Sequence, residues 1–213
     1  MATDLTELAS RARHDLRSPL TALKGFSSII LSQRNRLTPG QLQQFMEAIC
    51  QAGDQIVRLV DAFEVLTRFA DGERVVNCQP SAISTLIDDV LKGWSTQHTS
   101  RKFSASVPSD LPMVLCDPAR TRLVIDTLIE QVIARAGPNV DVRVGVVPNG
   151  STLHVLVATS DAASTTDGVS DLLSGRLPYK QGIAMLAAEC IAEAQGGQLL
   201  TEEGMFALVL PVQ

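Results

Sequence analysis

The sequence predicts an α+β protein in which a long helical hairpin precedes an α/β sandwich. Apolar residues recur at intervals of three or four from about residue 4 to 35 and again from 42 to 66, the spacing of amphipathic helices. Short apolar runs typical of strands begin only after residue 72, and helical segments separate them. We therefore expect two domains, residues 1–71 and 74–213.

One apolar stripe predicts the first helix, over residues 4–35. Its members are Leu5, Leu8, Ala12, Leu16, Leu20, Leu23, Phe26 and Ile30. A second helix is predicted to start at "LTPGQ", because Thr38 is a candidate N-cap, Pro39 suits the first helical position and Gln41 completes a capping box. The second stripe ends before Asp71 and Gly72, which indicate a break.

The length of this hairpin predicts self-association. Two helices of roughly 30 residues are each about 45 Å long. An isolated pair of that length cannot cover its own apolar stripes, whereas two copies packed as a four-helix bundle can. We therefore expect a homodimer.

The remaining segments alternate between strand and helix. In chain order we expect a strand at 74–80, a helix at 81–97 capped by Ser81, a strand at 102–108, a helix at 117–137, a hairpin at 141–160 turning around Pro148–Gly150, a loop at 159–175, a helix at 182–197 and a strand at 204–212. Strands covered by helices on one face make an α/β sandwich.

Composition excludes several classes of protein. The net charge is −5 and the basic residues are scattered, so no nucleic-acid partner is expected. The longest apolar runs are too short to span a bilayer, and the acidic N-terminus is no secretory signal, so no membrane association is expected. The four cysteines form no C-x-x-C pair, so we expect neither a metal site nor a disulfide framework, and a cytoplasmic location.

Residues 14–20, "HDLRSPL", combine groups that suit phosphoryl chemistry. His14 lies on the side of its helix opposite the apolar stripe, so it is predicted to be exposed. Asp15 can accept a hydrogen bond from one ring nitrogen and leave the other nucleophilic. Arg17 adds positive charge, and Pro19 cannot donate to the carbonyl of Asp15, so the helix should bend or loosen there.

This motif resembles the H-box of bacterial two-component histidine kinases, and the order of the predicted elements extends the resemblance over nearly the whole chain. The resemblance implies that His14 carries the phosphoryl group and that Asp15 acts as base or orienting group. It also implies that Ser18 takes part in dephosphorylating a partner. These three roles come from the family and not from the spacing.

The second domain resembles the ATPase domain of the same family, with changed residues in its nucleotide pocket. Gln131 aligns with a magnesium-binding asparagine, and Ala134 replaces a phosphate-binding lysine. Asp161 aligns with the adenine-reading aspartate, but the two glycines that follow it in the family are absent. A third glycine-rich element retains only Gly182, beside Lys180. We therefore expect a degenerate pocket that has lost nucleotide binding.

The sequence thus predicts a histidine phosphotransferase that passes a phosphoryl group between His14 and aspartates of receiver domains, without a cofactor. Those domains would belong to response regulators or a hybrid kinase, and Arg17 and Lys24 would face them. One alternative is an ATP- and Mg²⁺-dependent sensor histidine kinase core, and another is a non-catalytic pseudokinase scaffold. Because His14 lies near the start, a complete chain would receive its input from a partner, whereas a fragment would lack its sensor.

Overall fold

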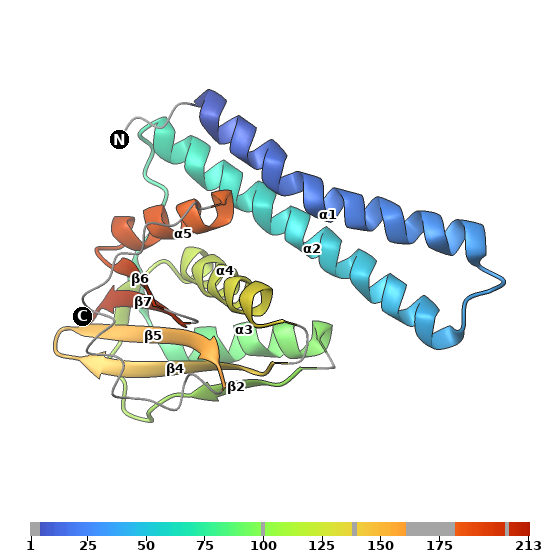
Figure 1. Cartoon of the computed structure of the whole chain (residues 1–213). Helices are drawn as coiled ribbons and strands as arrows, with labels where there is room; N and C mark the ends of the chain where they lie inside the picture. The colour runs from blue at the N-terminus through green and yellow to red at the C-terminus, as the bar shows by residue number, and fades with distance from the viewer. Residues whose placement is uncertain (1–4, 99–100, 138–139, 161–181, 203–204) are drawn as a thin grey trace. The chain divides into compact units, whose positions relative to one another are not determined.

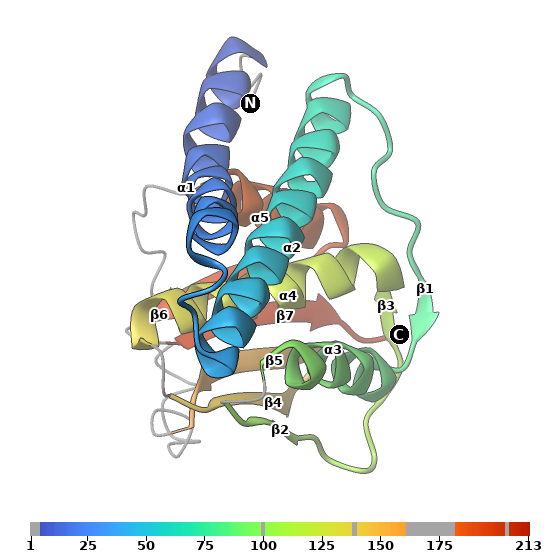
Figure 2. The same cartoon turned by 90° about the vertical axis from the view of Figure 1, so that its right-hand side faces the viewer.

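The computed structural model describes residues 5–98, 101–137, 140–160, 182–202 and 205–213. The chain divides into two compact units: the first contains residues up to Glu73 together with Gly182–Ala184, and the second contains the rest, from Arg74 onward. Figures 1 and 2 show a hairpin of two long helices in the first unit, and a sheet with helices in the second. The predicted α+β class is confirmed.

The hairpin consists of α1 (Leu5–Gln33) and α2 (Pro39–Ala70), as the two apolar stripes predict. Helix α1 continues through Pro19, whose side chain is buried. The missing N–H of this proline leaves the carbonyl of Asp15 without its usual helical donor but does not end the helix. The expected local loosening therefore leaves α1 a single helix.

The predicted capping box sets the start of α2. The backbone N–H of Gln41 donates to Thr38 Oγ1 at 3.2 Å, and the backbone N–H of Thr38 donates to Gln41 Oε1 at 3.0 Å. At the other end Gly72 has a φ of +75°, which favours glycine. These two signals fix the bounds of the helix, as the sequence predicts.

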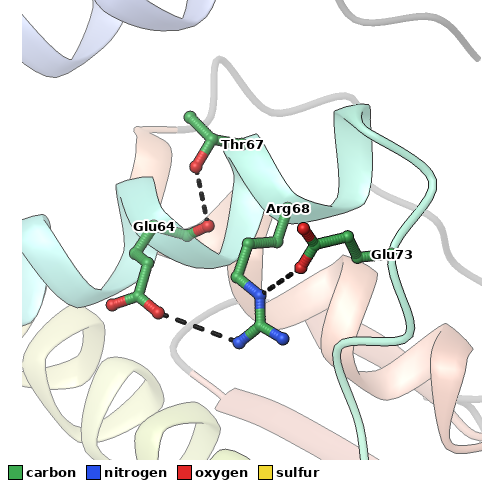
Figure 3. A network of polar contacts seen from close by, with 4 residues as sticks. All are labelled: Glu64, Thr67, Arg68 and Glu73. Atoms are coloured by element: carbon green, nitrogen blue, oxygen red, sulfur yellow. Dashed lines mark hydrogen bonds and ion pairs between the residues drawn. The ribbon is translucent and has the colours of Figure 1, made fainter.

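An arginine links the last turns of α2 to the chain that follows it (Figure 3). Arg68 Nε donates to Glu73 Oε2 at 2.7 Å, and Arg68 Nη1 lies 3.8 Å from Glu64 Oε1. Hydrogen bonding to Glu73 raises the pKa of Arg68 above its ordinary value. The Thr67 hydroxyl also donates to the carbonyl of Glu64 at 2.8 Å. This network connects the last turns of α2 to Glu73, which follows the helix.

The second unit contains a five-stranded sheet with strand order β2-β4-β5-β7-β6. These strands are β2 (Phe103–Ser106), β4 (Val142–Asn149), β5 (Thr152–Thr159), β6 (Gln198–Glu202) and β7 (Met205–Pro211). Strand β2 runs parallel to β4, and the other neighbours are antiparallel. A separate antiparallel pair joins β1 (Gln79–Ser81) to β3 (Val114–Cys116).

Three helices cover one face of this sheet: α3 (Ile83–Gln97), α4 (Pro118–Ala136) and α5 (Ile183–Ala194). Alternation along β4 directs Val142, Val144 and Val146 into the layer between sheet and helices, where all three are buried. Arg135 of α4 lies over the ring of Phe206 at 4.7 Å, on the same face. The two-layer sandwich predicted from the alternation of elements is therefore correct.

Local details differ from the predictions. Residues 74–78 form no strand, although Val75 and Val76 are buried, because ladder pairing starts only at Gln79. Ser81 does not cap α3: it ends β1, and its hydroxyl donates to the carbonyl of Gln79. The hairpin turn is formed by Gly150 and Ser151, since Asn149 pairs with Thr152. Strands β3 and β6 were not predicted, and most of the predicted 159–175 loop lies outside the described residues.

Asp117 connects three parts of the second unit. Its carboxylate accepts from the backbone N–H of Arg120 at 3.0 Å, which caps α4, and from the N–H of Asn77 at 2.8 Å. Its own N–H donates to Gln195 Oε1 at 2.7 Å, and the same oxygen accepts from the Thr121 hydroxyl at 3.0 Å. One residue thus fixes the start of α4, the segment before β1 and the chain after α5.

We expect Asp117→Ala to lower the free energy of unfolding of the second unit by about 1–3 kcal/mol, because a helix cap and a backbone acceptor are lost together. The fluorescence of Trp94, the single tryptophan, reports on this unit during urea unfolding. Asp89→Ala, at an exposed position of α3, is the matched control and should change the midpoint little. Equal midpoints for both variants would contradict the assigned role.

Candidate functional site

His14 lies on the exposed side of α1, as predicted. Its side chain is 83% exposed, whereas that of Asp15 is 22% exposed. His14 Nδ1 lies 3.2 Å from Asp15 Oδ1. With Nδ1–H donating to the carboxylate, the lone pair is on Nε2 of an imidazole that is open to solvent. The predicted exposure and hydrogen bond are confirmed, and the nucleophilic role of His14 stays a prediction.

Two side chains with hydroxyl groups, Ser18 and Thr21, follow His14 along α1. Ser18 is exposed and lies four positions after His14, so both residues are on the same side of the helix. The Thr21 hydroxyl donates to the carbonyl of Arg17 at 2.8 Å. The arrangement leaves the surface around His14 polar and accessible to a partner, while the role of Ser18 stays a prediction.

An apolar groove runs along the hairpin between α1 and α2. Its volume is about 970 Å³, and its apolar lining includes Leu16, Leu20, Leu59, Val60 and Phe63. Leu20 and Val60 are large side chains that remain about half exposed. The two helices thus leave apolar surface uncovered at the level of the candidate site.

Three cations of α1 border this groove: Arg13, Arg17 and Lys24. All three are exposed, and no carboxylate among the described residues forms an ion pair with them. Arg11, by contrast, is held by Glu7 at 2.6 Å. Arg17 and Lys24 were predicted from the sequence to face a partner, whereas Arg13 was missed, although its i,i+4 spacing from Arg17 could have identified it.

The structure describes two of the four residues assigned to a nucleotide pocket. Gln131 is half-buried on α4, and Gly182 directly precedes α5. Asp161 and Lys180 lie outside the described residues. Ala134 is exposed, and the neighbouring Arg135 is over Phe206. The amide oxygen of Gln131 is a suitable ligand for Mg²⁺. At position 134, however, where the family resemblance predicts a phosphate-binding lysine, α4 carries an alanine.

Residues 4–72 match the model of the "His Kinase A (phospho-acceptor) domain" family. The sensor protein KdpD of Clostridium acetobutylicum is 28% identical over 144 residues, or 68% of this chain and 15% of that protein. The sensor histidine kinase ZraS of Escherichia coli is 23% identical over 98% of this chain and 46% of its own length. The chain therefore spans less than half the length of these relatives.

Solved structures share the fold. The Acinetobacter baumannii histidine kinase AdeS superposes with a TM-score of 0.57 at 18% identity, covering 94% of this chain and 98% of AdeS. The histidine kinase ThkA, solved in complex with the response regulator protein TrrA, gives 0.56 at 19% identity, covering 98% and 61%. Residues 4–72 thus match a His Kinase A domain, and the chain as a whole resembles a two-component histidine kinase core, in which a sandwich similar in fold to the kinase ATPase domain follows the helical hairpin. Among the described residues no helix is long and apolar enough to cross a bilayer.

We expect Asp15→Asn to slow phosphoryl transfer to His14 by at least about 100-fold, because a neutral amide can accept the hydrogen bond from Nδ1–H but can neither act as a base nor stabilise positive charge on the ring. The rate is measured by single-turnover labelling with whichever donor is active. Glu7→Gln, which removes a carboxylate from the same helix without touching His14, should leave the rate unchanged. A normal rate in Asp15→Asn would show that the negative charge of Asp15 has no chemical role at the 3.2 Å contact.

Proposed function

We propose that this chain is the catalytic core of a sensor histidine kinase, in which the terminal phosphoryl group of ATP passes to His14 and then to an aspartate of a response regulator. The observation that carries the proposal is the exposed His14, with Nδ1 held by Asp15, inside a matched phosphoacceptor domain. The sensor kinases among the relatives and the kinase-like fold of the second unit support it. They favour this alternative over the phosphotransferase that the sequence predicts.

The chain's own residues perform a simple displacement. The lone pair on His14 Nε2 forms a bond to phosphorus, and the bond from phosphorus to the bridging oxygen of the leaving ADP breaks. Asp15 accepts the hydrogen bond from Nδ1–H and stabilises the positive charge that develops on the ring. Transfer to a regulator then forms an aspartyl phosphate and returns the lone pair to Nε2. Mg²⁺ would neutralise phosphate charge, with the amide oxygen of Gln131 as one oxygen ligand.

A histidine phosphotransferase that does not use ATP is the second candidate, and the exposed Ala134 favours it. Without a cation at this position α4 contributes less to phosphate binding. In this case the donor is an aspartyl phosphate of one receiver domain and the acceptor is that of another. The chemistry at His14 is the same in both candidates, so only the donor distinguishes them.

Incubation with γ-labelled ATP and Mg²⁺ tests the proposal directly. We expect label on His14, its loss in His14→Gln, and a marked reduction in Gln131→Ala. Asp89→Asn serves as the control. Label that comes only from a phosphorylated receiver domain would establish the phosphotransferase instead. A His14→Gln variant that still regulates its partner fully would favour the non-catalytic scaffold, and the kinase proposal would be abandoned.

We propose that two copies of the hairpin pack as a four-helix bundle. The apolar groove and the half-exposed Leu20, Val57 and Val60 supply the surface that a second copy would bury. Burying these side chains offsets the loss of translational and rotational entropy on association, and polar His14 stays outside the buried surface.

The expected cytoplasmic location and the absence of membrane and nucleic-acid partners remain predictions.

We expect Val60→Glu to raise the dissociation constant of the dimer at least about 100-fold, because unpaired carboxylates would be buried at its interface. Sedimentation equilibrium distinguishes the 22.8 kDa monomer from a dimer. Val60 is 53% exposed in the single chain, so the monomer should remain folded. Met113→Glu, at an exposed apolar position in the second unit, is the control, and a dimeric Val60→Glu would refute this interface.

We also propose that response regulators dock on α1 near His14, where Arg17 and Lys24 provide positive charge for an acidic receiver surface. The double variant Arg17→Ala/Lys24→Ala should slow transfer to a receiver about tenfold at low salt, with a smaller loss at high salt. Arg34→Ala/Arg36→Ala removes the same charge from the loop before α2 and should have little effect. Unchanged transfer in the first variant would exclude this docking surface.

A further inference from the structure

The second unit has a hollow that the phosphotransfer chemistry does not use. It lies on the face of the five-stranded sheet opposite to the helices, since Arg143 and Gly145 of its lining alternate along β4 with the buried Val142 and Val144. Its volume is about 400 Å³. The floor comes from β4, β5 and β7, and the chain immediately after β2 forms one wall.

The lining is mainly apolar. Val107 and Pro108 contribute the wall, and Leu156 and Met205 contribute to the floor. Gly145 keeps the hollow open because it has no side chain. A Cβ at this position would lie in ordinary contact, 3.9 Å from the carbonyl oxygen of Ser106 and 4.0 Å from Leu156 Cβ. The backbone around position 145 would therefore accommodate a larger side chain, and that side chain would fill the hollow.

Arg143 is the one charged residue of this lining. It is half-buried, and no carboxylate among the described residues forms an ion pair with it. Pairing across the ladder places Arg143 opposite Ala158, on the same face as the facing pair Gly145 and Leu156. A guanidinium beside apolar surface suits the planar, bidentate geometry of a carboxylate.

We propose that this hollow binds a small amphiphilic anion, a molecule with an apolar chain and a single carboxylate. Pockets of about 300–1,000 Å³ that are mostly apolar, with a few polar groups fixing orientation, are typical of small-molecule sites. The apolar chain contacts Val107, Leu156 and Met205, and the carboxylate pairs with Arg143. The ligand is a free monocarboxylate, and its binding requires neither ATP nor His14.

Decanoate is the probe, titrated below its micelle concentration into the full ¹⁵N-labelled chain. We expect saturable shifts at the amides of Gly145 and Ser106, and binding of decanol that is at least about tenfold weaker, because the uncharged headgroup cannot pair with a guanidinium. Arg143→Gln should weaken decanoate about tenfold and leave decanol unchanged. Gly145→Leu should abolish binding of both, and Lys102→Gln, a charge removed from outside the hollow, should alter neither.

Equal affinity for decanoate and decanol would overturn the proposal, as would unchanged decanoate binding in Gly145→Leu. Shifts confined to Leu20 and Val60 would place the probe in the groove of the hairpin and would also overturn it. Labelling of His14 is scored separately on the same variants. If decanoate does not bind but His14 is labelled normally, only the proposal for this hollow fails. If His14 is not labelled but decanoate binds, only the kinase proposal fails.

Discussion

The apolar stripe of α1 constrains the whole first unit. Leu16 and Leu20 point toward the groove, so a residue two positions before Leu16 must lie on the other side of the helix. His14 therefore remains exposed, although the helix that carries it must bury its other face. The same constraint leaves the large apolar side chains Leu20 and Val60 half exposed in a single chain. The exposure of His14 and the incomplete burial of the hairpin therefore have one origin.

The imidazole ring of His14 is held by a short-range contact within α1. Asp15 is the next residue, and its 3.2 Å contact to Nδ1 needs no long-range packing. Pro19, one turn later, cannot donate the helical hydrogen bond to the carbonyl of Asp15, yet α1 remains continuous. The contact between His14 and Asp15 therefore lies within one helical segment.

The second unit is held by contacts between residues far apart in the chain. Asp117 binds the backbone of Asn77 and Arg120 and donates to Gln195, linking segments separated by up to 78 positions. The outer face of its sheet carries Arg143 beside an open hollow, a combination that local patterns do not reveal. Its surface chemistry thus depends on how strands are paired and not on any motif.

Sequence patterns alone predict the two long helices, the capping box at Thr38, the hairpin of β4 and β5, and the exposed His14 with its neighbouring carboxylate. Each depends on periodicity or on contacts within four residues, which the sequence states directly. Tertiary structure alone decided the short strands β3 and β6, the failure of Ser81 to cap α3 and the connections of Asp117. It also decided the placement of Arg143, because a ladder brings together residues that are distant in the chain, and no local pattern records their partners.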